Sequence, residues 1–310
     1  MKTFTSVYPN RLQSEHLRIV KSNEALKILC CADPNYSDKT PLLIMNGQFE
    51  HTAHFTDMLN LEACIGSTGP VFKHGHCVFD KTIHTPYIIY YDYKNSNLPK
   101  VTTDYFANAF EDLIDRANLS DIDAILASCG AITGVKTSKN PRMKNIVALN
   151  MPIPRCLLAD TTELKRLFSL SELIKNPSRL NPKYFLTYLY VVNTMKDYVG
   201  FTHDYAHQFR DLEYVKQMGD WNKVKALFSI ANDNKPSNFW EMLMGWSAAT
   251  INHLSPGELS DGACTVDEEF LKAAGIDYML YDDGCHYNCD SSPKTFELAY
   301  TQLLELKRTR

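Results

Sequence analysis

The chain has 310 residues, of which 45% are hydrophobic and 22% charged, a composition typical of a globular protein with a large core. Its formal net charge of −4 argues against a nucleic-acid-binding surface. The sequence contains neither an apolar stretch of membrane-spanning length nor an N-terminal secretory signal, so we expect a cytoplasmic protein whose nine cysteines stay reduced.

The first half predicts strands that alternate with helices. Short apolar runs predict strands in 16–23, 26–33, 40–47, 86–93, 123–126 and 144–152. Residues 102–120 have apolar side chains at helical spacing behind a threonine cap, and a second helix begins in the small-residue stretch after Leu126. Because the strands are almost wholly apolar, we expect an α/β fold with a mostly parallel sheet covered by helices on both faces.

The second half predicts an insertion and then a return to alternation. Residues 153–246 have helical periodicity with Pro, Gly and Asn breaks and no clear strand, which indicates a helical cap or lid. After residue 247 we predict a strand with a polar loop, a short helix ended by Gly275, another strand and a terminal helix. The core is therefore predicted from 1–152 and 247–310.

Three predicted loops at strand ends carry reactive side chains. Ser128 and Cys129 lie in "DAILASCGAITG", Asp261 lies in "SPGELSDG", and His286 lies in "DDGCHY". A nucleophile needs a base within hydrogen-bond reach, and that base needs a carboxylate to orient it. Ligands of such sheets bind beyond the carboxyl ends of the strands, where we expect these loops to meet.

These motifs resemble those of the α/β-hydrolase fold with an inserted helical cap. "LLIMNGQF" resembles the strand and turn that supply half of an oxyanion hole, and "AILASCGAITG" resembles the nucleophile elbow. "SPGELSDG" resembles the acid loop and "DDGCHY" the final histidine loop, over a match of about 15–152 and 247–308. The resemblance implies Asp261 as acid, His286 as base, and oxyanion donors on the backbone of Gln48 and Gly130.

The elbow departs from the usual G-x-S-x-G pattern, so two frames are possible. The nucleophile of an elbow has a positive φ, and the residues two before and two after it are squeezed between strand and helix. Those neighbours are Ala127 and Ala131 if Cys129 attacks, but Leu126 and Gly130 if Ser128 attacks. Because a leucine at that place should clash, we predict Cys129 as the nucleophile, with Ser128 as the alternative.

The predicted function is acyl transfer from an ester or thioester through a covalent acyl-enzyme, most simply as a hydrolase or thioesterase. The substrate is expected to be a small-molecule or carrier-bound acyl group, with no cofactor. Two alternatives stay open: an acyltransferase or cyclase with the same triad, and a catalytically silent α/β-hydrolase fold that serves as a binding protein. A nucleotide site is remote, because neither common glycine-rich phosphate loop occurs.

Two further groups of residues have partial metal-ligand spacing. Cys285 and Cys289 flank His286, and His203 and His207 are four residues apart on a predicted helix. The first group lacks the additional ligands of a zinc site, and histidines spaced like the second more often face solvent or line a pocket. We therefore predict no metal.

Overall fold

The computed structural model describes the backbone of slightly less than half of the chain. The described residues are 9–10, 17–22, 26–31, 39–45, 77–78, 80, 82–91, 102–156, 208–230, 259–260, 264–281 and 293–310. Among these residues, no helix has the length and apolar character needed to cross a membrane.

An eight-stranded sheet forms the centre of the molecule, in the order β13-β10-β8-β7-β4-β6-β3-β2. The strands are β2 (Leu17–Ser22), β3 (Leu26–Cys31), β4 (Thr40–Met45), β6 (His84–Tyr91), β7 (Ile122–Ala127), β8 (Met143–Leu149), β10 (Val224–Ser229) and β13 (Tyr278–Tyr281). The six strands from β6 to β13 are mutually parallel, whereas β3 is antiparallel to both of its neighbours. The predicted α/β class with a mostly parallel sheet is confirmed.

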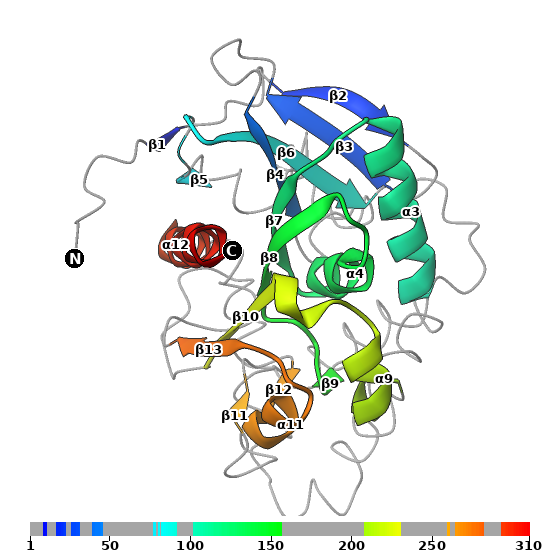
Figure 1. Cartoon of the computed structure of the whole chain (residues 1–310), viewed down its shortest axis with the longest axis vertical. Helices are drawn as coiled ribbons and strands as arrows, with labels where there is room; N and C mark the ends of the chain where they lie inside the picture. The colour runs from blue at the N-terminus through cyan, green and yellow to red at the C-terminus, as the bar shows by residue number, and fades with distance from the viewer. Residues whose placement is uncertain are drawn as a thin grey trace, which may run out of the picture.

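Helices cover both faces of this sheet (Figure 1), as predicted. The helices α3 (Thr103–Arg116) and α4 (Cys129–Thr137) lie on one face, and α12 (Pro293–Thr309) lies on the other. Successive side chains of a strand point to opposite faces, so the strands divide their residues between two cores. In β7, for example, Ala124 and Leu126 join the core under α3 and α4, whereas Ile125 and Ala127 join the core under α12.

Local sequence explains where the best-defined helices begin and end. The Thr102 hydroxyl caps α3 by accepting a hydrogen bond from the Tyr105 N–H at 3.1 Å. Helix α11 (Glu268–Ala273) is capped by Asp267 and is followed by Gly275 at φ 72°, as the sequence predicts for a helix ended by glycine.

The remaining described elements are short. They are β1 (Pro9–Asn10), β5 (Cys77–Val78), β9 (Arg155–Cys156), η8 (Gln208–Arg210), α9 (Leu212–Gln217), η9 (Trp221–Lys223), β11 (Leu259–Ser260) and β12 (Cys264–Val266). β1 pairs with β5, and β11, β12 and β9 form a separate three-stranded sheet.

The expectation of a purely helical insertion over 153–246 is wrong at its C-terminal end. Residues 224–229 form β10, which pairs in parallel with β8 on one side and β13 on the other. Ala226, Leu227 and Phe228 are fully buried, so this segment belongs to the central sheet. Residues 157–207 and 231–246 lie outside the described residues, and a cap formed by them stays a prediction.

Candidate active site

The turn between β7 and α4 is a sharp strand-to-helix junction centred on Ser128. β7 ends at Ala127 and α4 begins at Cys129, so a single residue connects them. Ser128 has φ 51° and ψ −120°, a region that is costly for a residue with a side chain. The Ser128 side chain does not cap the helix. A strained residue on a strand-to-helix turn is the geometry of a nucleophile elbow.

The expectation that Cys129 occupies the strained position is therefore wrong. Cys129 is the first residue of α4, and the positive φ belongs to Ser128. The predicted clash of Leu126 does not occur because α4 has a glycine opposite it. A Cβ atom on Gly134 would lie 1.9 Å from Leu126 Cδ1, so the missing side chain is what makes room for the leucine.

The backbone around Ser128 is fixed by the next strand. The Ser128 N–H donates to the Leu149 carbonyl of β8 at 2.8 Å, and the Ala131 N–H donates to the Ser128 carbonyl at 3.0 Å. Only 9% of Ser128 and 6% of Cys129 is exposed, and the Ser128 hydroxyl donates to the Cys129 sulfur at 3.9 Å. The two residues at the turn are thus nearly buried.

If Ser128 is the nucleophile, the oxyanion donor also differs from the predicted one. In an elbow, the backbone N–H of the residue after the nucleophile forms half of the oxyanion hole. With Ser128 at the turn, that residue is Cys129 and not Gly130, which becomes the small residue two positions after the turn. The first N–H groups of a helix have no acceptor within the helix itself, which suits them to bind an anion. Gln48, the other predicted donor, lies outside the described residues.

The predicted base follows a strand of the eight-stranded sheet, whereas the strands beside the predicted acid belong to another sheet. His286 and Asp261 both lie outside the described residues. β13, the edge strand before His286, ends at Tyr281. β11 and β12, on either side of Asp261, belong to the small three-stranded sheet.

The strand that sequence reasoning missed has an acidic residue after it. β10 ends at Ser229, the Ile230 N–H donates to the Tyr281 carbonyl at 3.0 Å, and "ANDNKP" follows with Asp233. Asp233 itself lies outside the described residues. The sequence signal for this strand was the apolar run "VKALFS" followed by polar residues. The helical periodicity on both sides of the run made a helix the expected structure.

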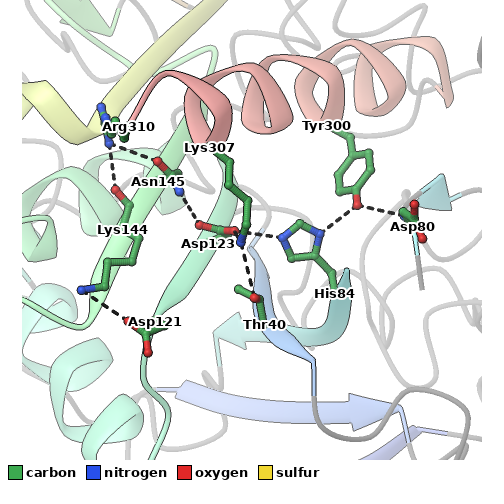
Figure 2. A network of polar contacts seen from close by, with 10 residues as sticks. All are labelled: Thr40, Asp80, His84, Asp121, Asp123, Lys144, Asn145, Tyr300, Lys307 and Arg310. Carbon is green, nitrogen blue, oxygen red and sulfur yellow. Dashed lines mark hydrogen bonds and ion pairs between the residues drawn. The ribbon is translucent and has the colours of Figure 1, made fainter. Parts of the chain in front are cut away.

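A second polar cluster lies near the amino-terminal ends of β6, β7 and β8. Figure 2 shows its side chains. Asp123 of β7 accepts from His84 Nε2 at 2.9 Å, from Lys307 Nζ at 2.7 Å and from Asn145 Nδ2 at 2.7 Å. His84 Nδ1 lies 2.8 Å from the Tyr300 hydroxyl, which accepts from the Asp80 N–H at 2.9 Å. In a neutral imidazole, Nε2–H donates to Asp123 and Nδ1 accepts from Tyr300, which satisfies every group.

Burial and hydrogen bonding shift the pKa values of two groups in this cluster. Burial raises the pKa of Asp123, but hydrogen bonds from His84, Lys307 and Asn145 outweigh it and hold that pKa below its ordinary value. Burial raises the pKa of Tyr300, so its hydroxyl keeps its proton. His84 and Asp123 are fully buried, and a depression of about 600 Å³ is lined by Asp123, Asn145 and Lys307 among others.

The described residues provide no metal site. They contain no group of three or more His, Cys, Asp or Glu side chains close enough to hold an ion. The residues considered from the sequence, His203, His207, Cys285 and Cys289, lie outside this part of the chain.

Comparison with known proteins finds similarity only at the level of structure. No family model matches the sequence, and no curated protein sequence matches it. A proline iminopeptidase from Mycobacterium smegmatis has 11% identity and a TM-score of 0.48, over 94% of this chain and 98% of that one. A hydrolase from Pseudomonas aeruginosa has 12% identity and a TM-score of 0.49, over 94% and 99%. A putative epoxide hydrolase from Klebsiella pneumoniae has 12% identity and a TM-score of 0.48, over 93% and 97%.

The chain has an α/β-hydrolase fold. The features that define it here are the order of the eight strands, the antiparallel β3, the helices on both faces and the strained turn after β7. Similarities of this size do not identify an activity, because one fold hosts many functions.

Proposed function

We propose that the protein is an acyl-transfer hydrolase in which Ser128 is the nucleophile. The observation that carries the proposal is the backbone of Ser128, at φ 51° between a buried strand and the first turn of a helix. A non-glycine residue in this region costs of order 1–3 kcal/mol, and such strain is concentrated at active sites. The Ser128 side chain makes no capping hydrogen bond to α4.

The chemistry follows from the loops at the carboxyl ends of the strands. Ser128 Oγ attacks the carbonyl carbon of an ester or thioester while His286 accepts the hydroxyl proton. The backbone N–H of Cys129 and one from the loop at Gln48 stabilise the oxyanion, each by a few kcal/mol. His286 then returns the proton to the leaving alcohol or thiol, and water releases the acyl group by the same steps.

The proposed acid is Asp233, with Asp261 as the alternative. Asp233 follows β10, a strand of the central sheet that lies between β8 and the strand preceding His286. It keeps the chain order of nucleophile, acid and histidine. Asp261 keeps the same order, but it follows β11 in the separate sheet.

A serine nucleophile changes the expected acceptor. A thiol nucleophile would favour thioesters and acyl transfer, because a thiol exchanges with thioesters at nearly balanced energy. Acyl exchange between a serine hydroxyl and a thioester is not balanced in energy in this way. We therefore propose hydrolysis of a small-molecule ester as the principal activity.

A fluorophosphonate probe, which phosphonylates activated serines, tests the proposal. Intact-protein mass spectrometry should show one adduct on the wild type, and peptide mapping should place it on Ser128. The adduct should disappear in Ser128→Ala and persist in Cys129→Ala, which keeps the backbone N–H. An adduct lost only in Cys129→Ala would return the nucleophile to the thiol, and no adduct in any variant would favour a silent binding protein.

The choice of acid needs its own pair of variants. Asp233→Asn should lower the labelling rate by about 10²-fold or more, because the imidazolium loses its carboxylate. Asp261→Asn should label at close to the wild-type rate. The reverse result would assign the acid to Asp261.

A further inference from the structure

A chain of hydrogen bonds crosses the carboxyl ends of β7, β8, β10 and β13. The Ser128 N–H donates to Leu149 O at 2.8 Å, and Asn150 follows Leu149 directly. Asn150 bonds to Ser229, and the next residue, Ile230, donates to Tyr281 O at 3.0 Å. The loops of the proposed nucleophile, acid and base leave the sheet after Ala127, Ser229 and Tyr281.

Asn150 contributes its side chain to this chain of bonds. Its Nδ2 donates to Ser229 Oγ at 2.8 Å, and its Oδ1 accepts from the Ser229 N–H at 2.7 Å. Its own N–H donates to the Leu227 carbonyl at 2.8 Å, so Asn150 is tied to β10 at three points. Both Asn150 and Ser229 are fully buried.

The backbone of Asn150 is also strained. Its φ is 43°, in the left-handed region. Glycine adopts this region readily, and asparagine adopts it more often than most other residues do. A buried residue in this conformation persists only where its surroundings hold it. The two-way bond with Ser229 supplies that restraint, because an amide offers both a donor and an acceptor in one plane.

We propose that Asn150 is a positioning residue that sets the distance between the nucleophile elbow and the acid loop. This inference rests on the proposed roles of Ser128 and Asp233. Through Leu149, Asn150 fixes the β8 carbonyl that holds the Ser128 N–H, and through Ser229 it fixes the residue from which the acid loop departs. Small displacements of reacting groups reduce rates steeply, about 10²-fold for an ångström.

Two variants remove the bond in different ways. Asn150→Gly keeps the positive φ and deletes the amide, whereas Ser229→Ala deletes the hydroxyl acceptor and leaves its N–H bonded to Asn150 Oδ1. Phosphonylation by a fluorophosphonate should slow by about tenfold or more in Asn150→Gly and by less in Ser229→Ala. Ser229→Thr should recover the rate because it restores the hydroxyl. Should Asn150→Gly fail to fold, Ser229→Ala and Ser229→Thr decide the question.

The pH profile of labelling separates positioning from general weakening of the fold. An acid displaced from the histidine stabilises its charged form less, so the midpoint of the rate-against-pH curve should fall by about half a pH unit. Asn145→Ala is the matched control, because Asn145 is a buried asparagine of β8, the strand that ends just before Asn150, and it bonds across to Asp123 near the opposite end of that strand. It should lower stability and leave the midpoint unchanged.

The results distinguish this inference from the proposed function. If the wild type is not labelled at Ser128, the proposed function fails. If the wild type is labelled but both Asn150→Gly and Ser229→Ala react within about twofold of its rate at the wild-type midpoint, only the positioning role fails. An equal loss and an equal midpoint shift in Asn145→Ala would also overturn it.

Discussion

At the scale of single residues, the β7–α4 turn shows how a leucine is accommodated where an elbow ordinarily has a small residue. Leu126 is fully buried on the α4 face of the sheet, and it fills the place where a side chain on Gly134 would lie. The large and small residues have exchanged places across the strand–helix contact. The missing side chain at Gly134 therefore makes room for Leu126 beside the turn.

We expect Leu126 and Gly134 to be energetically coupled. Gly134→Ala should destabilise the protein by about 1–3 kcal/mol, although alanine normally favours a helix, because its Cβ overlaps Leu126. Leu126→Ala alone should cost about 2–5 kcal/mol. The double variant should cost less than the sum, since the new methyl enters the vacated space. Urea unfolding of all four proteins measures this cycle, and strict additivity would contradict the contact.

A matched control lies at Gly275. No atom lies within 4 Å of where its Cβ would be, but its φ is 72°. Gly275→Ala should therefore cost only the backbone term, about 1 kcal/mol, and this cost should not change in the background of Leu126→Ala.

At the scale of elements, Lys136 joins three helical segments. Its Nζ donates to Thr103 Oγ1 and Asp104 Oδ1 of α3, each at 2.6 Å, from a side chain that is only 5% exposed. The same ammonium lies 5.9 Å from the ring centroid of Phe209 and 5.4 Å from that of Tyr214. Helices α3 and α4 and the segment around α9 thus meet at one charge.

We expect Lys136→Met to destabilise the protein by about 2–3 kcal/mol, because methionine keeps the apolar stem and loses the bonds and the ring contacts. Lys216→Met on exposed α9 should change stability by less than about 0.5 kcal/mol, since its pair with Glu213 is solvated. Thermal denaturation of both variants compares them. Equal effects would mean that the buried lysine contributes no more than a surface one.

The helix α12 is fixed to the sheet by the buried carboxylate of Asp123. Lys307 and Tyr300 come from α12, His84 comes from β6 and Asn145 from β8, so one cluster joins the helix to three strands (Figure 2). Removing one member of a buried charged cluster leaves the others without compensation. The position of α12 therefore depends on the charge of Asp123.

Asp123→Asn should destabilise the protein by about 3–5 kcal/mol at neutral pH and flatten its acid dependence. The pKa of Asp123 is lowered in the folded protein, so its contribution to stability is fully present above the ordinary value of about 4. That contribution is lost as the pH falls through the lower, folded-state pKa. Urea unfolding from pH 7 down to about pH 3 should show a steeper decline for the wild type than for the variant.

The control for this pH series is Asp112→Asn. Asp112 pairs with Arg116 on α3, and both side chains are about half exposed, 42% and 55% respectively. This variant should change stability by less than about 0.5 kcal/mol and retain the wild-type pH dependence. If Asp123→Asn kept that dependence too, the acid sensitivity would come from other carboxylates.

At the scale of the whole molecule, the sequence was informative wherever a property is local. The buried strands and the capped helix α3 follow from apolar runs and from Thr102, and small residues after Leu126 marked the turn. The frame of the turn required knowing that Gly134 lies opposite Leu126, which is a tertiary contact. The cluster around Asp123 could not be predicted for the same reason, since it is also made of tertiary contacts. His84 and Tyr300, for example, are 216 residues apart in the sequence. Strand β10 was not predicted because its six residues lie within a stretch of helical periodicity.

The two cores lie on opposite faces of one sheet, so we expect them to unfold together. Phe110 of α3 and Leu303 of α12 are both fully buried, in different cores. Phe110→Ala should cost about 3–5 kcal/mol and Leu303→Ala about 2–5 kcal/mol. Because the residues share no partner across the sheet, the double variant should be additive within about 0.5 kcal/mol. Guanidinium unfolding followed by circular dichroism and by tryptophan fluorescence should give coincident curves for each variant. A variant whose two curves separate would show that one face unfolds without the other, and that the shared strands do not couple the helices on either side.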